Sequence, residues 1–307
     1  MATLTNLIDQ VVLNLSGYTL QQDRSTYLSA ACTTTTSSSA SPTTLSFGSM
    51  DNIGKGTIEI DEELMYVDTY DATSKTATVS PWGRGYLGST ATTHLLDARV
   101  TISPTLPRFA IKQAINDTLN AMSSSLYTIQ KTSIVWNPTV STYVLPVVAG
   151  GINAIFGVYW QSIGPSKEWI KVQRWTFNAD ENVATWGANA QTITIADYIT
   201  PGRIVEITYG ADATVFASNT DTFASTGFPD SCRDVVILGA TWRMLINLDP
   251  ARSTMNSPQA DETNSKRPFG SSGTTTKQVY GMFQQRLNEE VRQQQAIHPI
   301  RTHKSAR

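Results

Sequence analysis

Charged side chains are scarce in this sequence. They make up 16% of its 307 residues, whereas soluble proteins average about a quarter. The formal net charge is only −2, and a protein dedicated to binding nucleic acid would normally be strongly basic. Low charge combined with many threonine and serine residues is common in β-rich proteins that assemble through uncharged surfaces.

Cysteines and long apolar runs are also scarce. Cys32 and Cys232 are the only two cysteines, which excludes a disulfide framework and favours two unlinked thiols. No apolar run approaches the ~20 residues that a membrane-spanning helix requires. The N-terminal segment, MATLTNLIDQVVLNL, lacks the basic region and continuous apolar core of a signal peptide. We therefore expect a soluble protein, or part of a soluble assembly, with no membrane partner.

The residue types that usually carry chemistry are few and unfavourably spaced. His94 ends a glycine-rich loop, where a structural role is expected, and His298 and His303 have no Cys, Asp or Glu at zinc-ligand spacing. Asp61–Glu63 lacks the alternating oxygen ligands of a calcium loop and is interpreted as a solvated turn or a subunit-facing salt bridge. Gly83–Gly88 is not followed by the Lys-Ser/Thr pair of a phosphate loop. The sequence predicts no catalytic residue, metal or cofactor, and no enzyme.

Four segments have the apolar periodicity of helices. They are Leu4–Leu15, a segment that begins at Arg108 and reaches Met122, a segment from Asp230 to Asp249, and roughly Thr276–Gln295. The first three each carry an apolar face too broad for an isolated surface helix. We therefore expect these three helices to pack together.

Alternating apolar residues predict strands in two regions. Thr57–Ile60 and Thr76–Ser80 flank the polar turn Asp71–Lys75, and the loop that follows contains three glycines able to adopt positive φ. From Thr132 onwards, short strands separated by Gly, Pro, Asn and Asp predict an antiparallel sandwich or barrel. This second region is rich in tryptophan, which could stack sugars, although core packing or subunit contacts are the favoured interpretation.

The order of these elements predicts an α+β fold, namely a small helical bundle with two inserted antiparallel β-modules and a C-terminal helix plus extended tail. The predicted helical core comprises residues 1–30, 104–131 and 229–250. The first β-module covers 31–103 and the second, a sandwich or barrel, covers 132–228. Residues 251–275 are interpreted as a linker, and residues 276–307 as the C-terminal helix and a docking tail.

The segment from Thr57 to His94 contains the most specific pattern in the chain. It reads I-x-I-D-x-E-x-M-x-V, a short turn, T-x-T-V, then R-G-Y-x-G-S-T-A-x-x-H, with D-x-R-V following. The pattern resembles the β-domain of head-to-tail adaptor (connector, or neck) proteins of long-tailed bacteriophages of the siphophage type, especially those of actinobacterial hosts. The residues of the structural loop are Gly83, Arg84, Gly85, Tyr86, Gly88 and His94.

The resemblance implies a structural virion protein at the head-tail junction, assembled in the host cytoplasm. It implies a homo-oligomeric ring, a dodecamer, that joins the portal protein to a tail-proximal neck or tail terminator protein. Phage DNA would pass through the lumen without sequence-specific binding. Two alternatives stay open, a tail-tip, baseplate or carbohydrate-binding β-rich virion protein, and a hydrolase whose site residues are not adjacent in sequence.

The C-terminal segment differs in charge from the rest of the chain. From Lys277 onwards it has six basic and two acidic residues, while the whole chain has a net charge of −2. One interpretation is a solvated helix with a frayed tail, and the other is a docking arm that lies in a groove of a partner. In the adaptors that the chain resembles, this segment engages the portal ring. The candidate docking residues are Tyr280, Phe283, Leu287, Ile297, Ile300 and Arg301.

Overall fold

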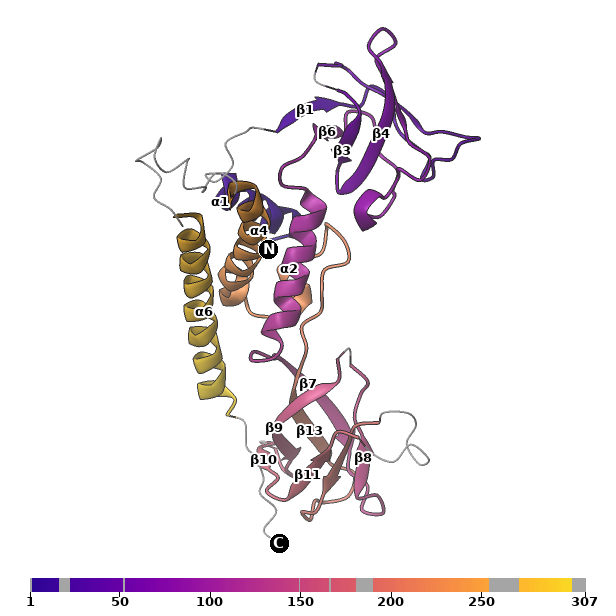
Figure 1. Ribbon diagram of the computed structural model, residues 1–307. Helices are drawn as coiled ribbons and strands as arrows, with labels where there is room; N and C mark the ends of the chain where they lie inside the picture. Colours follow the sequence, from indigo (N-terminus) through magenta and orange to yellow (C-terminus); the bar gives the residue numbers. More distant parts are fainter. Residues whose placement is uncertain are drawn as a thin grey trace. The chain divides into compact units, whose positions relative to one another are not determined.

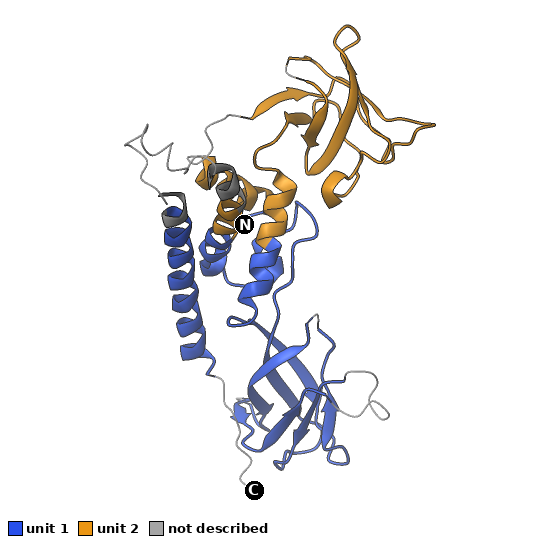
Figure 2. Cartoon of the chain, in the orientation of Figure 1, with its two compact units in different colours: residues 1–4, 116–239, 270–307 blue, residues 5–115, 240–269 orange. Residues whose placement is uncertain are grey.

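The computed structural model describes residues 2–16, 23–51, 53–148, 150–165, 167–180, 190–253 and 271–299. The chain divides into two compact units, which are coloured separately in Figure 2. Unit 1 contains residues 1–4, 116–239 and 270–307, and unit 2 contains residues 5–115 and 240–269. Each unit contains a β-domain and helical segments, and each is described separately below.

The β-domain of unit 2 is a six-stranded antiparallel sheet with the order β1-β6-β3-β4-β5-β2. Strands β1 and β2 lie at the two edges of this sheet. The residues that follow them, Leu28 and Phe47, pair with each other in an antiparallel β-bridge. The backbone N–H of Gly48 also donates to the carbonyl of Tyr27 at 2.9 Å. These bonds close the sheet into a small barrel, which leaves few unpaired strand edges. Its strands are β1 (Arg24–Tyr27), β2 (Thr44–Ser46), β3 (Gly56–Ile60), β4 (Glu63–Asp71), β5 (Thr76–Val79) and β6 (Arg99–Ile102) (Figure 1).

The barrel interior is apolar because alternate side chains of each strand point inward. Burying these side chains provides most of the favourable free energy of folding for such a small domain. A 3-10 turn, η1 (Tyr86–Gly88), lies in the loop between β5 and β6. The core consists of Leu28, Cys32, Leu45, Phe47, Ile53, Ile58, Ile60, Met65, Val67, Ala77, Val79 and Val100.

The helical part of unit 2 is connected to the barrel by carboxylates. Helix α1 (Leu4–Ser16) buries one apolar face, and α2 (Arg108–Met122) begins immediately after Pro107. The buried carboxylate of Glu59, on β3, accepts the backbone N–H of Arg108 at 2.6 Å and so caps the start of α2. Arg108 also pairs with Asp9 on α1 at 2.8 Å.

None of the helices in the described part of the chain combines the length and the apolar character of a membrane span.

The β-domain of unit 1 consists of two antiparallel sheets that enclose an apolar core. Their strand orders are β10-β9-β13-β7 and β11-β12-β8. The core includes Val158, Ile193 and Ile207, all fully buried, and Trp136, with the partly buried Trp175 packed against it. The strands are β7 (Thr128–Val135), β8 (Thr142–Val144), β9 (Ile152–Gln161), β10 (Trp169–Lys171), β11 (Trp175–Asn178), β12 (Thr192–Ile195) and β13 (Ile204–Ala211).

Helical segments of unit 1 pack closely at a glycine. Two 3-10 turns, η2 (Phe223–Thr226) and η3 (Asp230–Cys232), lead into α4 (Arg233–Ser253), and α6 covers Ser271–Ile297. A Cβ atom placed on Gly239 of α4 would lie 2.2 Å from the side chain of Thr118 on α2 and 3.0 Å from Phe283 on α6. The absence of a side chain at Gly239 therefore allows α2, α4 and α6 to approach one another.

The predicted fold class is wrong. The described residues form three antiparallel sheets with 13 strands and only four α-helices, so the protein is mostly β-sheet and is not a helical bundle with small insertions. The prediction gave too much weight to broad apolar helix faces, because a long 3.6-residue period is easier to detect than short strands such as β1 and β2. The helix starting at Arg108 and the strands at Thr57–Ile60 and Thr76–Ser80 are confirmed, as β3 and β5. A further strand, β4, lies between Ile60 and the polar turn. Both cysteines are free, as expected, and both are buried.

Candidate functional site: a buried ionic loop and the C-terminal helix

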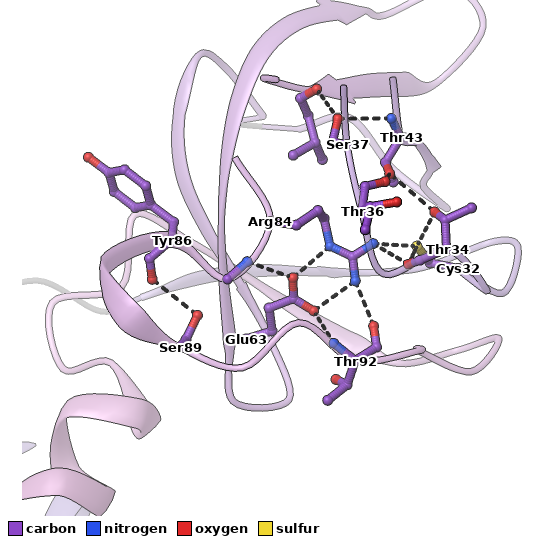
Figure 3. Close-up of polar contacts among 12 residues, drawn as sticks. Cys32, Thr34, Thr36, Ser37, Thr43, Glu63, Arg84, Tyr86, Ser89 and Thr92 are labelled. Carbon is purple, nitrogen blue, oxygen red and sulfur yellow. Dashed lines mark hydrogen bonds and ion pairs between the residues drawn. The ribbon is translucent and has the colours of Figure 1, made fainter. Parts of the chain in front are cut away.

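The carboxylate of Glu63 is the centre of the glycine-rich loop in the barrel. Glu63 is the first residue of β4 and is 1% exposed. Arg84 donates to both of its oxygens, from Nε at 2.6 Å and from Nη2 at 2.8 Å. This bidentate geometry is the strongest arrangement available to an arginine–carboxylate pair. Figure 3 shows the guanidinium lying beside the Glu63 carboxylate.

The loop chain wraps around the same carboxylate. Glu63 accepts the backbone N–H groups of Gly85 at 3.0 Å and of Thr92 at 2.9 Å. The Nε2 atom of His94 lies 2.9 Å from Glu63, and its Nδ1 atom lies 2.7 Å from Asp61. The residues from Gly85 to His94 are therefore fixed by one buried anion.

Arg84 uses its remaining donors to connect the loop to the extended segment after β1. Its Nη2 atom donates to the carbonyl of Thr92 at 2.6 Å, and its Nη1 atom bonds to the carbonyl of Thr34 (Figure 3). The same Nη1 atom lies 3.4 Å from the sulfur of Cys32. Because a buried charge is costly unless it is paired and hydrogen-bonded, these bonds are what make a buried arginine tolerable.

The electrostatics of the cluster favour its charged forms. Burial alone would raise the pKa of Glu63, but hydrogen bonds from Arg84, His94 and the loop backbone outweigh it and lower the pKa to about 2. Burial opposes protonation of His94, yet the carboxylates of Asp61 and Glu63 raise its pKa above the usual 6.5. When protonated, His94 can donate from both ring nitrogens. The cluster is therefore an ionic core, with two cations shared by carboxylates.

The loop backbone is unusual at both glycine and non-glycine positions. Gly85 and Gly88 have φ of 60° and 86°, as their residue type suggests, but Trp82 and Leu87 also have positive φ, at 62° and 55°. Bulky residues rarely adopt this conformation, and each instance costs about 1–3 kcal/mol. The side chains of Trp82 and Leu87 are 87% and 70% exposed. The ionic core thus holds two strained residues with their apolar side chains in solvent.

Gly83 is required for a different reason from the one expected. It does not have a positive φ, but a Cβ atom there would lie 2.9 Å from the carbonyl oxygens of Ser80 and Tyr66. The nearby ring of Tyr86 packs at a tilt against Tyr66, with centroids 5.5 Å apart. Close backbone approach, rather than backbone conformation, therefore explains Gly83.

The interpretation of Asp61–Glu63 as a solvated turn is wrong for Glu63, which is buried. Glu62 pairs with Lys112 at 3.2 Å, and Asp61, with φ of 56°, reaches His94 from a more exposed position. His94 has a structural role, as expected. Its ring contacts Asp61 and Glu63, in addition to the backbone hydrogen bonds that it forms with Cys32. Within the described residues, no group of three His, Cys, Asp or Glu side chains could hold a metal ion.

The C-terminal helix α6 is attached to the rest of unit 1 by apolar and polar contacts. Phe283 and Leu287 are 6% and 8% exposed, so both belong to the interior of the unit. Arg286 pairs with Asp234 at 2.7 Å and with Glu290 at 3.0 Å. Near the end of the helix, the side-chain amide of Gln294 donates to and accepts from the backbone of Tyr127.

The other candidate docking residues lie on the surface or outside the described chain. Tyr280 and Ile297 are 44% and 73% exposed. Ile300 and Arg301 lie outside the described residues, and so does His303. A docking role for α6 can therefore involve Tyr280 and Ile297 directly, whereas Phe283 and Leu287 position the helix.

A cavity of about 540 Å³ lies beneath the last turns of α6. It is lined in part by Leu126, Tyr127, Phe228, Cys232, Ile297 and His298. Burial, with the nearby Glu290 carboxylate, raises the pKa of Cys232 to about 12, so its thiol is protonated and unreactive at neutral pH. The ring of His298 packs against Phe156, with centroids 5.7 Å apart.

Sequence reasoning missed the pairing of Glu63 with Arg84. One signal was available, because an arginine between two glycines in a β-rich segment is forced close to the backbone and then needs a carboxylate partner. Which of the nearby acidic residues supplies it depends on strand register. No protein-family model and no curated protein matches this chain.

Proposed function

We propose that this chain is a structural subunit of a bacteriophage neck, a head-to-tail adaptor that assembles with copies of itself between portal and tail. The segment Thr57–His94 carries the proposal, because it bears the resemblance to adaptors and has the physical character of a docking module. Its buried ionic side chains bond to one another, while Trp82 and Leu87 extend into solvent. Catalysis needs polar groups directed at a substrate, whereas docking needs rigid apolar anchors.

The C-terminal segment supports a portal contact in this proposal. Helix α6 is anchored in its own unit, and its last residue, Ile297, is well exposed. The residues that follow include one large apolar residue, Ile300, and three basic residues, Arg301, Lys304 and Arg307. Such a segment suits a groove on a partner, with Ile297 and Ile300 as apolar contacts and Arg301 as a charge contact.

The charge of the chain is compatible with DNA moving through a ring. A strongly basic lumen would bind phosphates with high, salt-dependent affinity and would oppose ejection. The formal net charge of −2 and the excess of basic residues in the C-terminal segment leave the rest of the chain acidic. We expect the channel-facing surface to be neutral or acidic.

The test is co-assembly of the full chain with the portal protein encoded beside it, examined by native mass measurement and electron microscopy. We expect a closed ring of this chain on the portal. Deleting residues 300–307 should abolish portal binding without unfolding, and Ile300→Asp should weaken binding more than the control Ala306→Asp in the same tail. Unchanged portal binding by the truncated chain, or a location at the tail tip, would contradict the proposal.

A second candidate function, carbohydrate binding, is favoured by one observation in unit 1. Trp169 on the edge strand β10 and Tyr198 are 45% and 87% exposed, and exposed aromatic rings can stack on sugars. Titration of the chain with cell-wall oligosaccharides of the host would separate the two candidates. Binding that disappears in Trp169→Ala and Tyr198→Ala would favour this second function.

A further inference from the structure

The cavity beneath the last turns of α6 is formed by residues of unit 1 alone, and much of its wall is apolar. Leu126 and Phe228, both buried, and the half-buried Ile129 contribute apolar side chains to it. Its volume of about 540 Å³ is within the range of ~300–1,000 Å³ found for pockets that hold small ligands. The cavity can therefore accommodate a large side chain together with its backbone.

Two polar side chains that line the cavity, Glu290 and Gln294, already have hydrogen-bond partners. Glu290 accepts the hydroxyl of Ser231 at 2.9 Å and Nη2 of Arg286 at 3.0 Å. The amide of Gln294 accepts the backbone N–H of Tyr127 at 3.1 Å and donates to its carbonyl at 2.5 Å. A polar ligand would have to compete with these bonds, whereas an apolar one gains by covering apolar surface. The cavity therefore favours an apolar occupant.

The last residues of α6 bring the chain to the wall of this cavity. Ile297 and His298 both line it. The backbone N–H of His298 donates to the carbonyl of Gln294 at 2.7 Å, and its ring packs against Phe156 on β9. The position at which the chain leaves α6 is therefore fixed by contacts within unit 1.

The residues that follow supply an apolar side chain within reach. Pro299 has no backbone N–H and cannot extend the helix. Ile300 comes next and is the one large apolar residue of the sequence from 299 to 307. Two residues of chain span at most roughly 7 Å, so Ile300 can reach the cavity that His298 lines. Docking costs little backbone entropy, because His298 is already placed and Pro299 has a restricted φ.

We infer that the C-terminal segment of the free chain docks in its own cavity beneath α6, with the Ile300 side chain against Leu126 and Phe228. Burying an isoleucine side chain favours the docked state by a factor of roughly 10 to 100, which the ordering of residues 299 and 300 reduces. The inference goes beyond the proposed function and does not depend on it. If the portal does take up this segment, it must compete with the cavity for Ile300.

The first test compares hydrogen–deuterium exchange in the parent chain and its tail variants. Peptides that cover residues 126–129 and 227–232 should exchange at least about threefold faster in the chain that ends at Pro299, because their cover is lost. Ile300→Asp in the full chain should have the same effect, with exchange in β13 unchanged. The matched control, Ala306→Asp, adds the same charge to the same segment and should exchange like the parent. Parent-like exchange in both tail variants overturns the inference.

The second test changes the cavity wall instead of the tail. The fluorescent apolar probe ANS should bind the chain that ends at Pro299 at least about tenfold more tightly than the full chain, because the apolar wall is then accessible. Gln293 is exposed and lines the cavity, so adding Gln293→Trp to the shortened chain should reverse this gain. The control Gln295→Trp, at an exposed position of the same helix outside the cavity lining, should not. Equal ANS binding by the full and shortened chains overturns the inference.

Protein concentration identifies which copy supplies the segment. Docking within one chain gives the same tail-dependent protection at every concentration, whereas protection that appears only as concentration rises indicates the tail of a second copy and overturns the inference. The proposed function is judged separately. Tail-dependent protection in a chain that does not bind the portal counts against the neck function alone. Portal binding by a chain whose cavity exchanges equally with and without residues 300–307 counts against the docked tail alone.

Discussion

The two β-domains of this protein are built from different kinds of interior. The barrel of unit 2 buries Glu59, Glu63, Arg84 and His94 alongside its apolar core. The described strands of the sandwich in unit 1 bury no charged side chain, and their buried polar residues include Thr192 and Thr208. Similar strand patterns can therefore produce one domain whose loops are fixed by ion pairs and another that depends on apolar packing.

This contrast also predicts that the stability of the two domains responds to different kinds of substitution. A buried ion pair contributes little net stability compared with apolar packing, but removing one partner leaves an uncompensated charge. The barrel should therefore respond strongly to single polar substitutions and to pH. The sandwich should respond mainly to changes in side-chain volume.

The largest expected effect comes from Glu63→Gln. The substitution keeps the shape of the side chain but leaves Arg84 and His94 without their shared anion, and we expect a loss of about 3–5 kcal/mol in unfolding free energy. Hydrogen–deuterium exchange, resolved by peptide, should show lost protection in β3–β6 and unchanged protection in β9 and β13. Parent-like exchange in the barrel would show that the ionic core is dispensable.

The next largest effect is the loss of unfolding free energy on replacing a glycine with alanine, compared between one glycine of each domain. Gly85 combines φ of 60° with a space in which a Cβ atom would lie 2.8 Å from the carbonyl of Ser89, whereas Gly202 has φ of 75° and no neighbour within 4 Å. Gly202→Ala should cost about 1 kcal/mol through backbone strain. Gly85→Ala should cost roughly 2–4 kcal/mol, because a steric clash adds to the strain. Chemical denaturation of the two variants measures the difference, and equal costs would show that the loop can relax around Ser89.

The pH dependence should also distinguish the domains. The pKa of Glu63 is lowered from 4.5 to about 2, so its contribution to stability is present above 4.5 and is lost as pH falls towards 2. The pKa of His94 is raised above 6.5, so its contribution is present below 6.5 and is lost as pH rises through its folded value. Burial raises the pKa of Glu59 from 4.5 to about 7, and its contribution likewise declines as pH rises across that range.

We therefore expect the barrel to be most stable in mildly acidic solution and to lose stability above neutral pH. The sandwich should show a decrease only on the acid side, because the pKa of its Asp197 is lowered by Arg174 and by backbone N–H groups, despite slight burial. Exchange protection measured from pH 4 to pH 9 tests the contrast. His94→Gln should reduce the alkaline-side slope in barrel peptides, and a sandwich that loses protection in parallel would contradict the prediction.

The smallest expected effect is that of Glu206→Gln in the sandwich. Glu206 pairs with Lys131 at 2.8 Å, but the lysine side chain is 61% exposed. Exposed pairs of this kind contribute about 0–1 kcal/mol. The melting temperature of Glu206→Gln should therefore stay close to that of the parent chain, in contrast to Glu63→Gln. A large decrease would show that the edge strand β7 depends on this pair.

Several features of the fold could be predicted because their signals are local. The start of α2 at Arg108 follows from Pro107 and the apolar period that begins there, and the turn before β5 follows from its polar residues. Gly85 and Gly88 were identified as positions of positive φ for the same reason. Each of these signals lies within a few residues, so no knowledge of distant partners is needed.

Other features could not be predicted because they depend on partners far apart in the sequence. Glu63 and Arg84 are separated by a hairpin and a loop, and a shift of strand register by one residue would turn Glu63 to the opposite face. The closure of the barrel depends on the pairing of Leu28 with Phe47 across two strands whose sequence signals are weak. The apolar stripe of α6 was visible, but not that Phe283 and Leu287 face their own unit.

Local sequence signals were therefore enough to place the start of α2 and the turn before β5, and they favoured two unlinked thiols. Long-range contacts were needed to show that β-sheet dominates, that Glu63, Arg84 and His94 form one buried ionic core, and that Trp82 and Leu87 are exposed and strained. The physical reason is range. Backbone preference and hydrophobic periodicity act within a turn or a strand, whereas charge pairing, sheet closure and exposure depend on which distant segments come into contact.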